Sequence, residues 1–332
     1  MAGETTEPVS RRRVMMLGAT GTIGRATVRA LLAEGHETVC FIRGGADGRP
    51  SHALPEGVEL RFGDVTDPQS LARDGFRSER FDVLVSCLAS RSGVPEDAWA
   101  IDCRAHEAAL APARGAGVGH MILLSAICVQ RPELAFQQAK LAFEKSLVES
   151  GLTYSIVRPT AYFKSLSGQI ERVRRGKPFL VFGDGRLTAC KPISDDDLGR
   201  YLAGCITDPA RHDKVLPVGG PGPAITPFEQ GEMLFALLGR APRFRHVPVA
   251  LLDGIIGVLA GLGRLSPRLR AKAELARIGR YYATQSMLVW DEAAGRYDAD
   301  ATPSFGSETL QDFYARALRG EVADDRGEHK VF

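Results

Sequence analysis

The chain has 332 residues, of which 44% are hydrophobic and 25% are charged. This balance is typical of a globular protein with one large domain, or with one domain and a smaller lobe. The formal net charge of +2 gives no reason to expect a nucleic-acid partner. Six scattered cysteines form no CxxC pair and no metal-type spacing. We therefore expect a reduced, cytoplasmic protein without disulfides and without a metal site.

The two ends of the chain predict little structure. Residues 1–12 contain acids and lack the apolar core of a signal peptide, so we expect a disordered leader there. Residues 319–332 are highly charged, and we expect a loose tail. No stretch reaches the roughly 18 apolar residues that a membrane-spanning helix needs.

Short apolar runs alternate with helical patterns through the first half of the chain. The runs cover residues 13–17, 38–42, 58–62, 81–85, 121–124 and 154–157, and the helical patterns cover residues 23–33, 68–75, 96–116 and 135–150. Continuous apolar strands are buried on both faces, which is typical of a parallel sheet. The alternation with helices predicts βαβ units. We therefore expect an α/β, doubly wound Rossmann-type domain over residues 13–160.

The pattern changes after residue 160. Glycine and proline become frequent, and helical patterns over 195–207, 227–238 and 249–262 alternate with short strands. We expect residues 161–318 to form a smaller α+β lobe that lies over the open edge of the sheet and binds the substrate.

Three glycines join the first predicted strand to the first helix. Gly18, Gly21 and Gly24 allow a tight turn, so that backbone N–H groups and the helix N-terminus can face a pyrophosphate. A plain turn with a capped helix is the alternative. The position of the loop within a βαβ series favours a dinucleotide site. Its expected contacts are Gly18, Thr20, Gly21, Thr22, Ile23 and Gly24.

The end of the second predicted strand indicates which dinucleotide binds. NAD-binding domains usually place Asp or Glu there for the ribose hydroxyls. This chain has Arg43 at that point and no acid until Asp47. Arg43 can pair with a 2′-phosphate in a bidentate manner, although a solvated surface arginine is the alternative. The sequence therefore favours NADPH.

The ends of the other strands supply the remaining expected cofactor contacts, because ligands of such sheets bind beside the carboxyl ends of the strands. Asp64 and Val65 are expected near the adenine, and Leu88 and Ala89 near the ribose and pyrophosphate. Ser125 is expected near the nicotinamide, and Pro159 ends the sixth strand.

A phenylalanine and a lysine stand four residues apart in the helical pattern after the fifth strand. Phe136 and Lys140 share one helix face, and Ser125 precedes them. The arrangement resembles the extended and atypical short-chain dehydrogenase/reductases, which usually carry Tyr-x-x-x-Lys here. The resemblance implies that Lys140 holds the ribose, the alternative being a solvated lysine. Phe136 cannot donate a proton. Either the protein binds its cofactor without catalysis, or it reduces an acceptor that is not a carbonyl.

Long segments of unusual composition in the remaining sequence indicate a resemblance to a more narrowly defined family. They include residues 124–130, 154–166, 182–185, 190–194, 216–222, 226–232, 278–283 and 287–291, together with the final Val331 and Phe332. From about Arg12 to the end, the chain resembles the divinyl chlorophyllide a 8-vinyl-reductases. The resemblance implies NADPH-dependent reduction of the 8-vinyl group of a chlorophyllide-type tetrapyrrole to an ethyl group, in (bacterio)chlorophyll synthesis.

This reaction needs a proton for one carbon of the vinyl group. Tyr162, after the sixth strand, is the first candidate donor. The alternatives are Lys140, bound water, and a purely packing role for Tyr162. Lys164, Lys191 and Arg280 are candidate partners for the substrate propionate, although a surface charge is favoured for each.

Two other functions and two further properties stay open. The functions are an NADPH reductase of another conjugated alkene or quinone, and a non-catalytic NADPH-binding sensor or assembly protein. The basic segment 264–280 allows peripheral contact with an anionic membrane, but a solvated helix face is favoured. The oligomeric state is not determined by the sequence.

Overall fold

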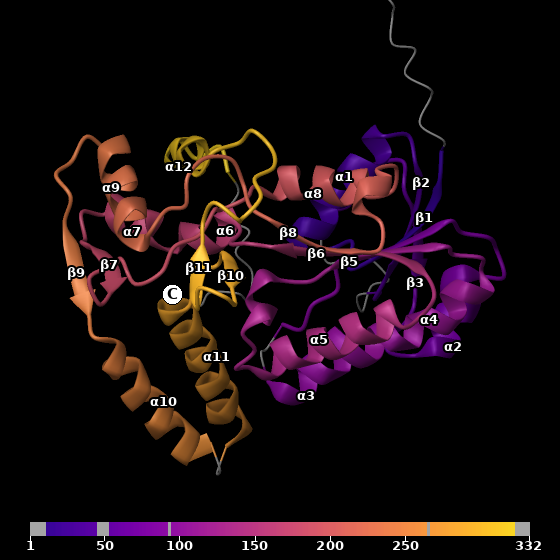
Figure 1. Cartoon of the computed structure of the whole chain (residues 1–332), viewed down its shortest axis with the longest axis horizontal. Helices are drawn as coiled ribbons and strands as arrows, with labels where there is room; N and C mark the ends of the chain where they lie inside the picture. The colour runs from indigo at the N-terminus through magenta and orange to yellow at the C-terminus, as the bar shows by residue number, and fades with distance from the viewer. Residues whose placement is uncertain (1–10, 45–52, 92–93, 264–265, 323–332) are drawn as a thin grey trace, which may run out of the picture.

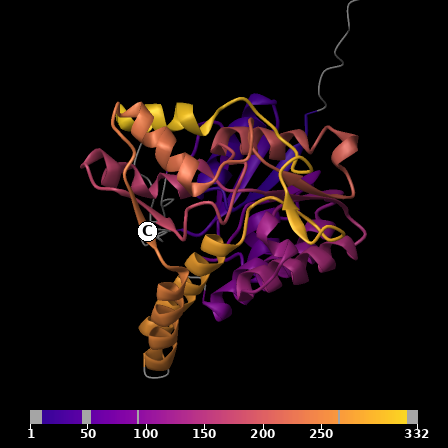
Figure 2. The same cartoon turned by 60° about the vertical axis from the view of Figure 1, so that its left-hand side comes forward.

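The computed structural model describes residues 11–44, 53–91, 94–263 and 266–322. Nearly all of the expected leader and most of the expected tail lie outside these residues, as does Asp47. Within them the chain forms a large sheet flanked by helices on both faces and a second group of helices and short strands beside it (Figure 1). Figure 2 shows a helical hairpin that extends away from both parts.

The central feature is a seven-stranded, wholly parallel sheet with the order β3-β2-β1-β4-β5-β6-β8. The α/β Rossmann-type prediction is confirmed. The strands are β1 (Arg13–Leu17), β2 (Glu37–Ile42), β3 (Glu59–Phe62), β4 (Val83–Ser86), β5 (His120–Leu124), β6 (Thr153–Pro159) and β8 (Lys214–Val218). The strand order reverses between β1 and β4, which is where sheets of this kind bind ligands.

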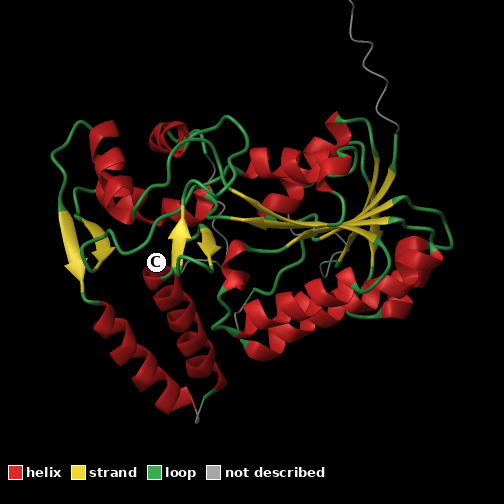
Figure 3. Ribbon diagram, viewed as in Figure 1, coloured by secondary structure: helices red, strands yellow, loops and turns green. Residues whose placement is uncertain are grey.

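Helices cover both faces of this sheet (Figure 3). One face carries α1 (Thr22–Ala33) and α8 (Asp195–Gly204), and the other carries α4 (Ala105–Gly115) and α5 (Ala135–Val148). The side chains of β1 alternate between the two layers, with Met15 and Leu17 in one core and Val14 and Met16 in the other. Burial on both faces explains why the strands are continuous apolar runs.

Short helical segments connect these layers. They are α2 (Pro68–Ser70), the π-helical turn η1 (Leu71–Phe76), α3 (Pro95–Ala98), the π-helical turn η2 (Trp99–Arg104) and the 3₁₀ turn η3 (Ile127–Gln130). The sequence pattern predicts one continuous helix over 96–116, and the structure interrupts it with η2. The wider turn changes the direction in which the side chains of η2 point, which matters for the site described below.

The second group of elements has its own core. Its sheets pair β7 (Phe179–Phe182) with β9 (Phe244–Val247), and β10 (Val289–Asp291) with β11 (Arg296–Asp298). Its helices are α6 (Phe163–Leu166), α7 (Ile170–Arg174), α9 (Pro227–Leu237), α10 (Val249–Gly263), α11 (Pro267–Thr284) and α12 (Leu310–Leu318), with the 3₁₀ turn η4 (Ser167–Gln169). The 3₁₀ turn η5 (Pro209–Arg211) instead lies beside the large sheet, between α8 and β8. The aromatic residues Phe163, Phe179, Phe235 and Tyr314 dominate the core between β7, α7, α9 and α12.

Two elements beyond the expected boundary at residue 160 belong to the large sheet and the helices that cover it. β8 pairs with β6, with Pro159 opposite Val218, and α8 packs against α1. The packing of α8 is close, because a Cβ atom on Gly199 would lie 2.6 Å from the backbone carbon of Ala26. The large sheet and its helical layers thus include residues beyond the expected boundary. After Val218 the chain returns to the second lobe.

The close α1–α8 packing predicts a specific cost for a methyl group. Gly199→Ala should lower the free energy of unfolding by about 1–3 kcal/mol, the usual cost of overpacking a buried contact. The matched control is Gly257→Ala in α10, where a Cβ would meet no atom within 4 Å. That change should be neutral or stabilise the helix by up to about 1 kcal/mol. Urea denaturation of both variants measures the difference, and equal effects would contradict the packing argument.

Candidate functional site

The glycine loop after β1 brings two backbone segments unusually close together. Gly18 has φ +76°, and a Cβ there would lie 2.5 Å from the carbonyl carbon of Cys87, in the loop after β4. A Cβ on Gly24 would lie 2.1 Å from the oxygen of Gly18. Only glycine fits at these two positions. The loops after β1 and β4 are therefore locked together at the point where the strand order reverses.

The N-terminus of α1 offers unpaired backbone donors to an anion. Its N-cap, Gly21, contributes no side-chain hydrogen bond, so the first N–H groups of the helix are left for another acceptor. The first turn of α1 contains no acidic residue. The positive end of the helix dipole points the same way. This cradle fits the pyrophosphate of a dinucleotide, as the glycine spacing predicts.

A lysine from the second lobe also reaches this helix end. Lys164 Nζ, on α6, donates to Thr22 Oγ1 at 2.8 Å. The sequence offers Lys164 only as a candidate partner for a substrate propionate, with a surface charge favoured. The structure instead places its ammonium group at the phosphate loop, 142 residues away along the chain. No local pattern could have indicated this, because the contact depends on how the lobe folds back over the sheet.

A buried carboxylate accompanies Lys164. Asp195 Oδ1, at the start of α8, has no hydrogen-bond partner in the described structure. Burial raises the pKa of Asp195 to about 6, and the positive charges of Lys164, Arg29 and Arg25 limit the rise. Sequence reasoning did not single out Asp195.

The expected adenine-side residues lie together at the edge of the sheet. Arg43, after β2, is exposed, and its charge helps to lower the pKa of Asp64, after β3. The main cause of that lowered pKa is a hydrogen bond from Thr66 Oγ1 to Asp64 Oδ1 at 2.7 Å. Val65 is buried in the core, whereas Arg43 and Asp64 are exposed.

The expected pyrophosphate-side residues Leu88 and Ala89 follow β4. The N–H of Leu88 donates to Ser86 Oγ at 3.4 Å, and Ser86 Oγ lies 2.8 Å from His106 Nε2. His106 Nδ1 lies 2.9 Å from the carbonyl oxygen of Ile101, which can only accept. Nδ1 therefore carries the proton, and Nε2 accepts from Ser86. This network fixes the loop that Leu88 begins.

Lys140 lies in a buried ion pair. Its Nζ is 3.0 Å from Asp102 Oδ1, and both side chains are almost fully buried. Asp102 stands in the π-helical turn η2, and it also accepts from Ser90 Oγ at 2.5 Å. The pair holds Lys140 beneath the loop that contains Leu88 and Ala89. The sequence analysis did not find Asp102, because its position depends on the π-helical turn.

Ser125 is buried after β5, and its hydroxyl is engaged by another side chain. Its Oγ donates to Glu144 Oε1 at 2.5 Å, and Glu144 pairs with Arg158 of β6. The serine therefore points its proton toward α5. Any contact with a nicotinamide uses its oxygen lone pairs or its backbone. Pro159 is buried at the end of β6 in the neighbouring strand.

Tyr162 caps the N-terminus of α6, in the segment that follows β6. Burial raises its pKa above the usual value, and the neighbouring Cys87, Cys128 and Asp195 raise it further. A tyrosine hydroxyl is protonated at neutral pH even at its usual pKa of 10, and the raised pKa makes this one a weaker acid. Cys128 Sγ also lies 3.9 Å from Tyr282 Oη of α11. The sequence analysis singled out neither Cys128 nor Tyr282 as a site residue.

Apolar side chains from both parts of the chain meet at this edge of the sheet. Phe136 packs with Ile127, Leu134, Tyr281 and Met287 in one cluster. Tyr281 Oη donates to the carbonyl oxygen of Cys128 at 2.9 Å, which fixes α11 against η3. In place of the tyrosine hydroxyl of the short-chain dehydrogenases, the site thus has a packed aromatic ring.

The other candidate cations have structural partners. Lys191 Nζ donates to the carbonyl oxygen of Thr302 at 2.9 Å, and Arg280 pairs with Asp253 of α10. Within the described part of the chain, no three His, Cys, Asp or Glu side chains are grouped so that they could hold a metal ion. All six cysteines are free thiols. No helix among the described residues is both long and apolar enough to cross a membrane.

Comparisons with known proteins agree with this geometry. Residues 18–209 match a family described as NAD(P)H-binding. The divinyl chlorophyllide a 8-vinyl-reductase of Zea mays is 48% identical over 98% of this chain and 84% of its own length. The photosystem II assembly factor Ycf39 of Cyanophora paradoxa is 31% identical over 72% of this chain and 73% of its own length.

A solved structure gives the same fold. The NADPH-dependent quinone oxidoreductase of Escherichia coli superimposes with a TM-score of 0.65 at 18% identity, over 92% of this chain and 99% of its own. An identity this low speaks for the fold alone. The match across nearly the whole length shows that both the large sheet and the second group of elements follow a common plan.

The buried, neutral His106 predicts a pH-dependent stability. Burial lowers its pKa from 6.5 to about 4, and the charge of Lys140 adds to the effect. The unfolded chain takes up a proton near pH 6.5, whereas the folded chain does so only near pH 4. The stability from this side chain is therefore complete above about pH 6.5. It falls by up to about 3 kcal/mol as the pH drops to about 4.

Urea unfolding at about pH 7 and about pH 4.5 measures this loss. His106→Gln should lose less stability between the two values than the unaltered protein does. The exposed His246→Gln is the control and should leave the difference unchanged. An unchanged difference for His106→Gln would contradict the assignment.

Proposed function

The chain belongs to the divinyl chlorophyllide a 8-vinyl-reductase family, and from this premise we propose that it reduces the 8-vinyl group of a divinyl chlorophyllide to an ethyl group with NADPH. The observation that carries the proposal is 48% identity to the maize reductase over 98% of the chain. In this proposal residues 13–160, with α8 and β8, hold the cofactor, and the remainder of 161–318 holds the tetrapyrrole.

The cofactor is NADPH in this proposal because of the charge at the end of β2. Arg43 is exposed there beside Asp64, and Ile42, before it, is apolar. The arginine fork suits a 2′-phosphate, which only NADPH carries. Gly18, Thr20, Gly21, Thr22, Ile23 and Gly24 would receive the pyrophosphate at the start of α1. Lys164 would add a charge at the same place.

Phe136 favours reduction of a carbon–carbon double bond over reduction of a carbonyl. A carbonyl oxygen needs an acid at the tyrosine position of the short-chain dehydrogenases, and Phe136 cannot supply a proton. NADPH supplies a hydride to one vinyl carbon when it is bound. The other vinyl carbon then needs only a proton, which completes the ethyl group.

Tyr162 is the proposed source of that proton. Its hydroxyl is protonated at neutral pH, and the residue stands near Cys87 and Cys128 beside the carboxyl ends of β4 and β5. Lys140 is the other catalytic candidate from the sequence. Because Lys140 is paired with buried Asp102, its proposed role is to hold the ribose and the loop after β4.

The direct test is incubation of the purified protein with divinyl chlorophyllide and NADPH. Loss of the divinyl absorption bands, with growth of the monovinyl product, supports the proposal. Turnover of a smaller conjugated alkene or a quinone, without turnover of the chlorophyllide, would replace it with the first alternative. NADPH binding without any turnover would favour a non-catalytic role, which the similarity to an assembly factor makes worth testing.

Removal of the Arg43 guanidinium should weaken NADPH binding selectively. A charge-assisted hydrogen bond contributes about 1.5–3 kcal/mol, so Arg43→Ala should raise the Kd for NADPH roughly tenfold or more. The Kd for NADH should change little. Arg114→Ala, an exposed arginine at the end of α4 and thus at the opposite edge of the sheet, is the matched control. Equal weakening of NADPH and NADH would contradict the 2′-phosphate assignment.

Removal of the Tyr162 hydroxyl should slow the chemical step. General acid catalysis contributes roughly a hundredfold or more, so Tyr162→Phe should lower kcat by that factor and leave the Kd for NADPH unchanged. Tyr201→Phe removes one hydroxyl from a half-buried tyrosine that packs against Phe305, away from the site, and should retain full activity. A fully active Tyr162→Phe would exclude this side chain as the acid.

A further inference from the structure

The hairpin of α10 and α11 leaves an apolar helix face uncovered. α10 contains fifteen residues, and among the described residues none of them is buried. Asp253 is its only charged residue. Leu251, Ile255, Val258 and Leu262 are all exposed, with Val258 at 63% and Leu251 at 54% of full exposure. Their spacing of four, three and four residues places them in one stripe along the helix.

An adjacent face of α10 is the one that packs. Leu252, Ile256 and Leu259 are half-buried, and they lie roughly 100° around the helix from the exposed stripe. α10 packs mainly against α11. Figures 1 and 2 agree that the hairpin extends away from the rest of the molecule. Exposed apolar surface of this kind marks an interaction site in a soluble protein.

The length of α10 limits what it can contact. A helix of fifteen residues is too short to cross a bilayer, which needs about 20 residues. A helix with an apolar stripe can instead lie in the plane of a membrane surface, with that stripe at the boundary between headgroups and acyl chains. Such a helix binds best when cations stand beside the stripe.

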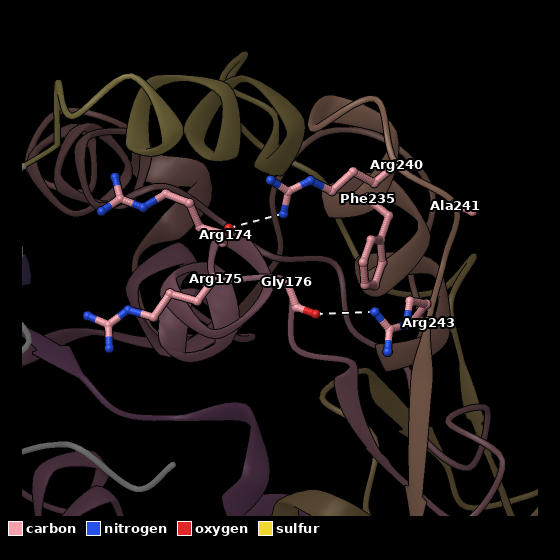
Figure 4. Close-up of a pocket in the computed structure, with 7 residues that line it drawn as sticks. All are labelled: Arg174, Arg175, Gly176, Phe235, Arg240, Ala241 and Arg243. Carbon is pink, nitrogen blue, oxygen red and sulfur yellow. Dashed lines mark hydrogen bonds between the residues drawn. The ribbon is translucent and has the colours of Figure 1, made fainter.

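Cations lie at the start of β9, the strand whose other end leads into α10. A hollow of about 470 Å³ between the end of α7 and the loop from α9 to β9 is lined by the arginines 174, 175, 240 and 243 (Figure 4). Arg174 and Arg175 share the single carboxylate Glu171, while Arg240 and Arg243 donate to backbone carbonyls. The hollow therefore has an excess of positive charge.

The hollow and the stripe belong to one edge of the molecule. β9 carries on through Pro248 into α10, at the edge farthest from the seven-stranded sheet (Figure 1). α11 adds Arg268 and Lys272, which are exposed near the tip of the hairpin. Two copies of this chain that met through these surfaces would bring like charges together. The charge distribution thus favours an anionic occupant over a second copy.

We propose that the α10–α11 hairpin docks the protein onto the surface of an anionic lipid bilayer. The stripe of α10 enters the boundary between headgroups and acyl chains, and the arginines beside β9 contact the lipid phosphates. The sequence analysis considered such contact for the basic segment 264–280, most of which is α11. The structure moves the main contact to the apolar helix α10. This inference does not depend on the reductase activity.

Flotation of the full chain with vesicles tests the proposal. At low salt the protein should float with vesicles of mixed phosphatidylglycerol and phosphatidylcholine and should stay behind with vesicles of phosphatidylcholine alone. Raised salt should weaken the binding, because ions screen the arginines. Val258→Glu should lower the partition coefficient at least tenfold. Val148→Glu introduces the same charge at an exposed valine at the end of α5 and should bind as the unaltered protein does.

Three results would overturn the proposal. They are an absence of flotation with anionic vesicles, equal binding by Val258→Glu and the unaltered protein, and a dimer in sedimentation that Val258→Glu dissociates while lipid binding is absent. The last result would assign the stripe to a second copy. Circular dichroism of both glutamate variants checks that they fold, and the high exposure of both valines gives no reason for misfolding. The readout is partition rather than turnover, so a failure here leaves the proposed reaction untouched.

Discussion

The whole site depends on the contact of bare backbone with bare backbone at Gly18. Because a Cβ there would lie 2.5 Å from the carbonyl carbon of Cys87, the loops after β1 and β4 can meet only without a side chain between them. Gly24 repeats the constraint one turn later against the oxygen of Gly18. Together they bring the start of α1 down onto the sheet, so that the free N–H groups of the helix face the edge where six parallel strand ends gather the other candidate residues.

Buried charges hold the second layer of the site in place. Lys140 with Asp102, and Glu144 with Arg158, each join a residue of α5 to another element. A buried ion pair contributes little net stability, but loss of one partner leaves a costly unpaired charge. These pairs therefore restrict how α5 can sit beneath the edge of the sheet. They also explain how a site can keep the lysine of the short-chain dehydrogenases while its tyrosine is replaced by Phe136. The lysine has a structural partner that does not depend on the tyrosine.

The sequence was most informative where physical demands are local. Strands buried on both faces must be apolar throughout, so β1 to β6 could be located to within about two residues. The glycine loop was predictable for the same reason, since its geometry excludes other residues. β8 was missed as a member of the sheet because Lys214–Val218 is an edge strand, half exposed and with Pro217 as its fourth residue.

Contacts that join distant parts of the chain were beyond local patterns. The contact of Lys164 with Thr22 spans 142 residues, and that of Tyr281 with Cys128 spans 153. The π-helical turn η2 follows from packing that a helical pattern does not record, and it decides where Asp102 points. The candidate catalytic residues could be named from the sequence. Their partners required the fold.

In the α10–α11 hairpin, the composition of the two helices and their arrangement in the structure indicate different membrane-facing elements. By composition, α10 is an apolar stretch too short to span a membrane, and α11 is basic, so α11 attracts attention as the membrane-facing element. In the structure the basic residues of α11 are partly neutralised, because Arg277 pairs with Glu274 and Arg280 with Asp253 of α10. Among the described residues, the arginines around the hollow are paired with one carboxylate, Glu171, and β9 connects them to α10. Attraction to an anionic surface therefore draws on two features of one edge of the molecule, the exposed apolar stripe of α10 and the arginines at the far end of β9.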